Sequence, residues 1–269
     1  MCSHLREWGC APHDPARERT TMKLDTIPLV TALLPALAAH LCYLVAAYHG
    51  HVSWCFPYFP DCVSISATGR HGPESVIFRA ALIPAAILMM IYWRLSRDWL
   101  RVLGTRMVRR NRIMVWFGMA AALGLFVYAS IIGEVGDLYY PHRRIAVILF
   151  YVFTYLAQVL MTVQMAPLAG IQGPWGARDG QMPAPLSRGL VAVLMAICGV
   201  VAVLGAASLL SWAFNDQYRR YEDAFEWGLT LLLLGHTFVT YFAWRDSGFQ
   251  TRFTIAGTRS LLHNHRDTE

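Results

Sequence analysis

Six apolar blocks, separated by polar segments rich in Gly, Pro and Arg, dominate the pattern of this chain. Each block is at least as long as the roughly 20 residues of helix that cross a hydrocarbon core about 30 Å thick. Backbone polar groups find no water inside that core, so each block has to be helical. The alternating polarity of a transmembrane barrel does not occur. The blocks occupy residues 27–48, 76–95, 113–133, 145–167, 189–213 and 225–244.

This pattern predicts an all-α, polytopic membrane protein built as a bundle of six transmembrane helices. A polar segment, residues 1–25, precedes the bundle domain, residues 26–245, and a tail, residues 246–269, follows it. The first segment lacks the basic start, short apolar core and small-residue cleavage site of a signal peptide. Because Met22 lies just before the first block, we expect residues 1–21 to be either a dispensable extension or the result of a mis-called start.

Composition and charge agree with this prediction and orient the bundle. Of the 269 residues, 56% are hydrophobic and 15% are charged, whereas about a quarter are charged in a typical soluble domain. Lys and Arg favour the cytoplasmic side of a membrane protein. If both termini are cytoplasmic, 17 Lys and Arg residues lie on the cytoplasmic side and 5 lie on the opposite side. The remaining one, Arg79, lies inside the second block. We therefore expect cytoplasmic termini, in a bacterial inner membrane or in a Golgi, ER, lysosomal or plasma membrane.

Arginines concentrate in the second loop, residues 94–112. Their expected partners are anionic lipid headgroups, since each basic residue near an anionic surface contributes about 1 kcal/mol of attraction. A plain orientation signal explains the same residues, and a protein partner is left open. The net charge of +6 needs no nucleic acid to account for it.

Two cysteines, Cys55 and Cys62, lie in the first loop on the expected non-cytoplasmic side. That side is oxidising if it is a lumen, a periplasm or the cell exterior, so a disulfide that closes the loop is expected. Two unpaired thiols are the alternative, because the sequence does not give the geometry that a disulfide requires. The six cysteines of the chain do not have zinc-site spacing.

Ionisable side chains gather at the non-cytoplasmic ends of several blocks, among them Glu74, Arg79, His142 and Glu226. Such groups are costly near the membrane and call for a partner or a function. Each acidic residue alone is also explained by the helix dipole, which favours negative charge at a helix N-terminus. The combination of acids, a histidine and an arginine at one end favours a shared polar site. His236, inside the sixth block, is either a helix-to-helix hydrogen bond or a ligand-binding residue.

Signatures of familiar enzymes are absent from the sequence. We find no phosphate-binding glycine loop, no GxSxG elbow, no HExxH motif and no HxxxxD acyltransferase motif. We expect no cofactor and no metal. A histidine between carboxylates, such as His142, can act as a general base, but the sequence identifies no nucleophile.

Short motifs carry a resemblance to a known family. Pro57-Tyr58 lies in the first loop, Pro73-Glu74-Ser75 precedes an aromatic residue and Arg79, and Glu226-Trp227 opens the sixth block. A Ser/Thr-Gly stretch lies between the first two motifs, and it contains Ser64, Ser66, Thr68 and Gly69. In these residues, and in a histidine before the fourth block, the chain resembles the FRAG/DRAM/SFK family of six-span membrane proteins. That family includes autophagy modulators, a GPI-lipid remodelling factor and the CWH amino-terminal domain.

One departure from the family pattern concerns the subfamily. Asp61-Cys62-Val63 stands where the autophagy branch has Ile-Ser-Asp, and the Glu226 segment looks closest to the GPI-lipid remodelling branch. The chain is therefore not assigned to either branch.

The resemblance implies a lipid-handling protein that binds or remodels a phospholipid or a GPI-type glycolipid in an extracytoplasmic polar pocket. The expected lipid-binding residues are Arg79, Ser66, Thr68 and His236. If the protein is an enzyme, the expected reaction is acyl transfer, and the expected acid–base residues are His142, Glu226 and Glu74. The alternative is a non-catalytic membrane organiser that affects lipid asymmetry, autophagy or signalling through the second loop. A transporter is a third hypothesis.

Overall fold

Helices make up the regular secondary structure of the part of the chain that the structure describes, apart from one isolated bridge between Ala169 and Leu186. The computed structural model describes residues 24–105, 107–134, 139–169, 186–214 and 218–249. The helices are α1 (Thr26–Tyr48), α2 (Ile65–Thr68), α3 (Glu74–Val102), α4 (Val108–Ile131), α5 (Tyr139–Met165), η1 (Ala166–Leu168), α6 (Arg188–Phe214) and α7 (Tyr218–Asp246). Most of the predicted terminal segments lie outside the described residues.

The predicted fold class, an all-α polytopic membrane bundle, is confirmed. Five helices of the described chain are long and apolar enough to cross a membrane, namely α1, α3, α4, α5 and α6. The sixth predicted block lies in α7, which has 29 residues but is not among those five. Its apolar run is interrupted by Glu226, His236 and three threonines, which lower its hydropathy. The count of six spans therefore stays a prediction.

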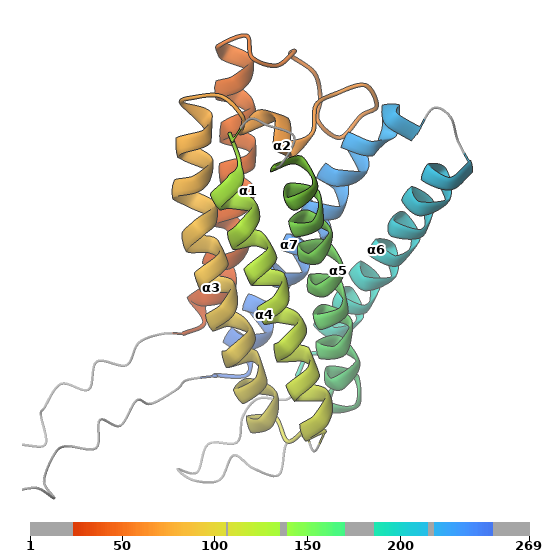
Figure 1. Ribbon diagram of the computed structural model, residues 1–269. Helices are drawn as coiled ribbons and strands as arrows, with labels where there is room; N and C mark the ends of the chain where they lie inside the picture. Colours follow the sequence, from red (N-terminus) through yellow and green to blue (C-terminus); the bar gives the residue numbers. More distant parts are fainter. Residues whose placement is uncertain (1–23, 106, 135–138, 170–185, 215–217, 250–269) are drawn as a thin grey trace, which may run out of the picture. The chain divides into compact units, whose positions relative to one another are not determined.

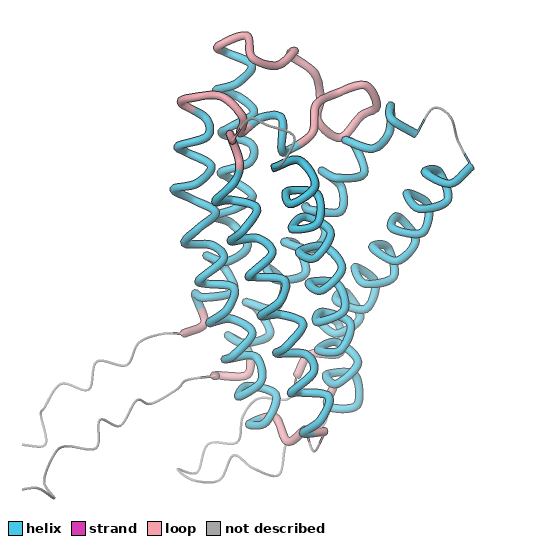
Figure 2. Tube along the Cα trace, viewed as in Figure 1, coloured by secondary structure: helices cyan, strands magenta, loops and turns pink. Residues whose placement is uncertain are grey.

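Helices that follow one another in the chain mostly pack side by side. α4 lies between α3 and α5, while α1 packs against α3 and α7 (Figure 1). The connection from α1 to α3, residues 49–73, includes α2, and we call it the first loop. Figure 2 shows the first loop at one end of the bundle, over the end of α1 and the start of α7. We call this end the first-loop end.

Helix α6 leans away from the rest of the bundle. It packs against α5 and α7, and its buried residues, Val191, Leu194, Cys198 and Val201, all lie in its first half. No residue of its second half is buried, and Figure 1 shows α6 diverging from α5 toward Phe214. In a bilayer, lipid therefore reaches the side of α5 that faces α6 near the first-loop end.

Two glycines allow the backbones of α3, α4 and α5 to approach closely. A Cβ atom at Gly118 would lie 2.1 Å from the ring of Trp93 on α3. A Cβ atom at Gly124 would lie 2.8 Å from the carbonyl oxygen of Ala146 on α5. Small residues at such crossings increase van der Waals contact, which drives helix association in membranes.

Candidate functional site

The first loop is tied to the start of α7 by polar contacts. Arg220 of α7 forms an ion pair with Asp61, with 2.6 Å between Nη2 and Oδ2. The indole N–H of Trp227 donates to the carbonyl oxygen of Val63 at 2.9 Å. Glu226 accepts a hydrogen bond from the backbone N–H of Ile65 at 3.3 Å. These contacts hold α2 over the first-loop end of the bundle.

An aromatic cluster centred on Trp227 packs beneath the first loop. The Trp227 side chain is 1% exposed and contacts the rings of His40, Tyr43 and Tyr58, with centroid separations of 5.2, 6.4 and 5.9 Å. His40 Nδ1 donates to the carbonyl oxygen of Ala36, so Nε2 accepts from the Tyr58 hydroxyl at 2.9 Å. Burial raises the pKa of Tyr58, which keeps this hydroxyl protonated as a donor.

The structure joins Cys55 and Cys62 in a disulfide whose Cα atoms are 5.6 Å apart, within the usual range for such bonds. The backbone N–H of Cys55 donates to the Tyr43 hydroxyl at 2.8 Å, and the same hydroxyl donates to the Cys55 carbonyl oxygen. The disulfide and Tyr43 together fix the middle of the first loop against α1.

A narrow cavity lies directly under α2, between α1, α3, α4, α5 and α7. The centres of water-sized molecules can occupy about 40 Å³ of it. Its wall is apolar except for Tyr128, Tyr151, Glu226 and Thr230. The Tyr151 hydroxyl contacts the Thr230 hydroxyl and donates to the carbonyl oxygen of Glu226 at 3.3 Å, so it joins α5 to α7. We call this space the upper cavity.

A second space, the lower cavity, continues the upper cavity toward the middle of the bundle. The two share the lining residues Pro35, Leu125, Phe150 and Leu234, so they adjoin. Along α7 their lining extends from Glu226 to Thr237, a rise of roughly 16 Å at 1.5 Å per residue. That length is about half of a 30 Å hydrocarbon core, or one leaflet.

Three hydroxyls that line these cavities have no hydrogen-bond partner among the described residues: those of Thr31, Tyr128 and Thr154. All three residues are at least nine-tenths buried. Buried polar groups in folded proteins are normally bonded to protein or to an ordered ligand or water. The cavities thus offer hydrogen bonds that the protein itself does not use.

Arg79, predicted to bind lipid, is engaged by the end of α4. Its Nε donates to the carbonyl oxygen of Ile132 at 3.0 Å, and Nη2 pairs with Glu134 Oε1 at 3.0 Å. Gly133 between these partners has a φ of +86°, a conformation that favours glycine. Arg79 therefore satisfies a carbonyl that the helix leaves free at its C-terminus.

Glu74, a predicted acid–base residue, is fully buried and pairs with a histidine of the first loop. Its Oε1 lies 2.7 Å from His51 Nδ1, and its Oε2 has no partner among the described residues. The His51 ring lies next to those of His49 and His71, at 5.7 and 4.7 Å between centroids. Across the described chain no three His, Cys, Asp or Glu side chains are arranged to hold a metal ion. Glu74 and Glu226 thus make their contacts with different partners.

The other predicted site residues are dispersed. Ser66 contacts the Ser64 hydroxyl at 3.1 Å, and the buried Thr68 donates to the Ile65 carbonyl oxygen at 2.7 Å, so both stabilise α2. His142 is exposed at the start of α5. His236 is fully buried and contacts the Thr162 hydroxyl at 2.8 Å. It lies ten residues beyond Glu226 on α7, roughly 15 Å along the helix, so it belongs to helix packing rather than to the first-loop end.

Comparison with known proteins assigns the family. A family model described as the Frag1/DRAM/Sfk1/Cwh43P N-terminal domain matches residues 24–247, most of the chain. The chain belongs to this family. The resemblance expected from the short motifs is thereby confirmed, and so is an integral, multi-pass membrane location. No curated protein and no solved structure matches the chain.

In this Frag1-family chain the motif residues of the first loop and of α7 have a structural explanation. Glu226 and Trp227, which open the sixth block, bind the backbone of the segment Val63–Ile65. Tyr58 of the Pro-Tyr motif contacts both Trp227 and His40. The motifs thus meet at the first-loop end and secure α2 over the upper cavity.

Several residues at or near the cavity of this Frag1-family protein have no distinguishing signal in the sequence. Tyr128 and Tyr151 lie inside apolar blocks and look like ordinary core aromatics. His51 lies in a polar loop with other histidines. Helical periodicity places a tyrosine on a helix face, but only the crossing of α5 with α7 brings Tyr151 to Thr230.

Proposed function

We propose that the protein binds a membrane lipid, with one acyl chain in the joined upper and lower cavities and the polar part of the lipid near Glu226. The observation that carries the proposal is the amphipathic character of this space. Its wall is mostly apolar over about one leaflet of depth, hydroxyl groups are distributed along it, and its carboxyl group, Glu226, lines the upper cavity alone. The cavities are narrow, which suits one chain rather than two.

The route of entry follows from what closes the cavity. The first loop covers the upper cavity, because Ile65 of α2 lines it and is held by Glu226. The disulfide and the Asp61–Arg220 pair oppose removal of that cover. The side of α5 that faces α6 is accessible where α6 diverges from it toward Phe214 (Figure 1). We therefore propose lateral entry from the bilayer, with separation of Tyr151 from Thr230 as the opening step.

The proposal retains part of the expected site and changes the rest. Glu226 stays as a polar contact of the lipid, and both phospholipids and GPI-type glycolipids are compatible ligands. Arg79 is not required, since its guanidinium is engaged by Ile132 and Glu134. A remodelling reaction would follow lipid binding, and no nucleophile is assigned to it.

A cavity-filling variant tests the proposal. Leu125 lines both cavities and is 6% exposed, so Leu125→Phe fills the passage between them. Leu231→Phe is the matched control, because Leu231 is 50% exposed on α7 and does not line either cavity. Native mass spectrometry of protein purified in mild detergent would measure the lipid retained. We expect the natural chain and Leu231→Phe to retain about one lipid and Leu125→Phe to lose it; equal retention by all three would refute the proposal.

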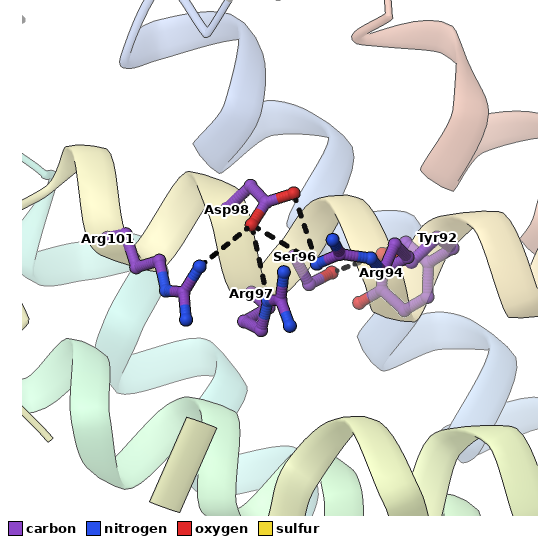
Figure 3. Close-up of polar contacts among 6 residues, drawn as sticks. All are labelled: Tyr92, Arg94, Ser96, Arg97, Asp98 and Arg101. Carbon is purple, nitrogen blue, oxygen red and sulfur yellow. Dashed lines mark hydrogen bonds and ion pairs between the residues drawn. The ribbon is translucent and has the colours of Figure 1, made fainter. Parts of the chain in front are cut away.

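A second function, attraction of anionic headgroups by the segment 94–112, is favoured by the charge distribution at the opposite end. Asp98 is the only acidic residue of that segment, which has seven arginines. Three of these, Arg94, Arg97 and Arg101, share the Asp98 carboxylate at 3.2–3.5 Å (Figure 3). Exposed arginines at the start of α4 add further positive charge. Binding to vesicles with and without phosphatidylserine would test this, and a lack of dependence on phosphatidylserine would argue against it.

A further inference from the structure

The polar end of the upper cavity has an unusual concentration of carboxylates. Glu226 lines the cavity, and Asp223 lies one turn earlier on α7, where it is half-buried and interacts electrostatically with Glu226. Glu222, next to Asp223, interacts with both of them. Among the described side chains, Arg70 of the first loop is a cation that acts on both Asp223 and Glu226.

Neighbouring charged residues are already paired with other partners. Asp61 holds Arg220, Glu134 holds Arg79, and Glu74 holds His51. Arg70 interacts electrostatically with Asp223 and Glu226, and Arg143 acts on the nearby Tyr128. Among the described side chains, the mouth of the cavity therefore has both signs of charge, and the carboxyl groups of Glu222, Asp223 and Glu226 lie on its α7 side.

An independent feature of the same cavity points to a polar ligand group. Tyr128 lines the upper cavity and is 5% exposed, and its hydroxyl has no hydrogen-bond partner among the described residues. It also interacts electrostatically with Glu226, so the hydroxyl and the carboxylate lie in the same region. A lipid with its chain in the cavity would bring its ester carbonyl, a hydrogen-bond acceptor, to this level.

We infer that the cavity selects a lipid whose headgroup carries a primary ammonium, that is, a zwitterionic aminophospholipid, over an anionic phospholipid. This inference rests on the proposed function and specifies its ligand. The ammonium donates hydrogen bonds to Glu226 and Asp223, the phosphate faces Arg70, and the Tyr128 hydroxyl donates to an ester carbonyl. Charge-assisted hydrogen bonds of this kind are stronger than neutral ones.

Selection also has a repulsive component. An anionic phospholipid would place its phosphate beside the same carboxylates with no ammonium to separate them. Juxtaposed like charges disfavour the wrong ligand, which is a common source of specificity. The carboxylates thus favour the ammonium and disfavour a lipid that has only the phosphate.

The test is a lipid competition with the full chain. The protein is reconstituted into nanodiscs of equimolar 1-palmitoyl-2-oleoyl phosphatidylethanolamine and phosphatidylglycerol, extracted in mild detergent, and its bound lipid is identified by native mass spectrometry. The test variant is Glu226→Gln with Asp223→Asn, which keeps an oxygen at residue 226 to accept from Ile65. The control is Asp246→Asn, the same type of change at the far end of α7. Thermal unfolding of each variant reports on its folding.

We expect phosphatidylethanolamine to be enriched roughly tenfold over phosphatidylglycerol, equivalent to about 1.4 kcal/mol. The double variant should lose this preference while still binding lipid, and the control should keep it. Retained lipid without a headgroup preference, or a preference unchanged in a folded double variant, overturns this inference alone. Absence of any retained lipid in the natural chain overturns the proposed function and this inference with it.

Discussion

Replacement of Arg79 by glutamine separates a structural role from a lipid-binding one. The guanidinium donates to the carbonyl oxygen of Ile132 and pairs with Glu134, both at the end of α4. Ile132 is fully buried, so its carbonyl would lose a partner that water does not readily replace. We therefore expect Arg79→Gln to lower the stability of the protein and to leave lipid retention unchanged.

The magnitude follows from the exposure of the two contacts. A hydrogen bond from a charged donor contributes about 1.5–3 kcal/mol. The pair with Glu134 adds at most about 1 kcal/mol, because such surface ion pairs are weak and the two side chains are 36% and 48% exposed. Glutamine keeps one donor of shorter reach, so we expect a net loss of about 2 kcal/mol. For a chain of this size that corresponds to a fall of roughly 4–8 °C in Tm.

The assay combines thermal unfolding in detergent with native mass spectrometry of the same samples. Arg70→Gln is the matched control, since Arg70 is exposed in the first loop and interacts electrostatically with Glu226 of the upper cavity. We expect Arg70→Gln to keep Tm and to weaken lipid retention, the opposite of Arg79→Gln. If Arg79→Gln loses its lipid with no change in Tm, Arg79 is a lipid ligand and our assignment is wrong.

Two further predictions concern packing and pH. Gly118→Ala should destabilise the protein by about 1–3 kcal/mol through overpacking against Trp93, whereas Gly199→Ala, with open space around its Cβ, should be neutral or slightly stabilising in the same unfolding assay. The hydrogen bond from Arg220 lowers the pKa of Asp61 below its usual 3.8, so the pair contributes stability above that pH and loses it as the pH falls through the lowered pKa. Thermal unfolding measured from pH 7 to pH 3 should therefore show that Asp61→Asn loses less stability on acidification than the natural chain. Identical pH profiles would contradict a stabilising role for the Asp61–Arg220 pair.

The helices and their approximate ends could be predicted because a membrane span requires a continuous apolar run. The predicted block 76–95 lies within α3, and 113–133 overlaps most of α4. The ends differ by several residues, since α3 continues to Val102 through arginines that leave the apolar core. Hydropathy reports the length inside the lipid, whereas the helix continues as long as its backbone stays hydrogen-bonded.

The candidate site was less predictable, because side-chain pairing depends on how the helices cross. The sequence placed Glu74, Arg79 and Glu226 near one end, and the structure gives each a separate partner. Nothing in the sequence specifies that Arg79 reaches the end of α4 or that Glu74 reaches His51. The short motif Glu226-Trp227 was informative because both of its side chains bind the first loop.

Photo-crosslinking with a phospholipid that carries a diazirine on one acyl chain is the most direct measurement of the central claim. The protein is reconstituted with this lipid, irradiated and digested, and the modified residues are identified by mass spectrometry. We expect adducts on cavity residues such as Leu125, Phe150 and Leu234, and we expect Leu125→Phe to reduce them. Adducts confined to outward-facing residues such as Leu231 and Trp212, unchanged in that variant, would show that the chain stays in the bilayer and would contradict a lipid-binding cavity.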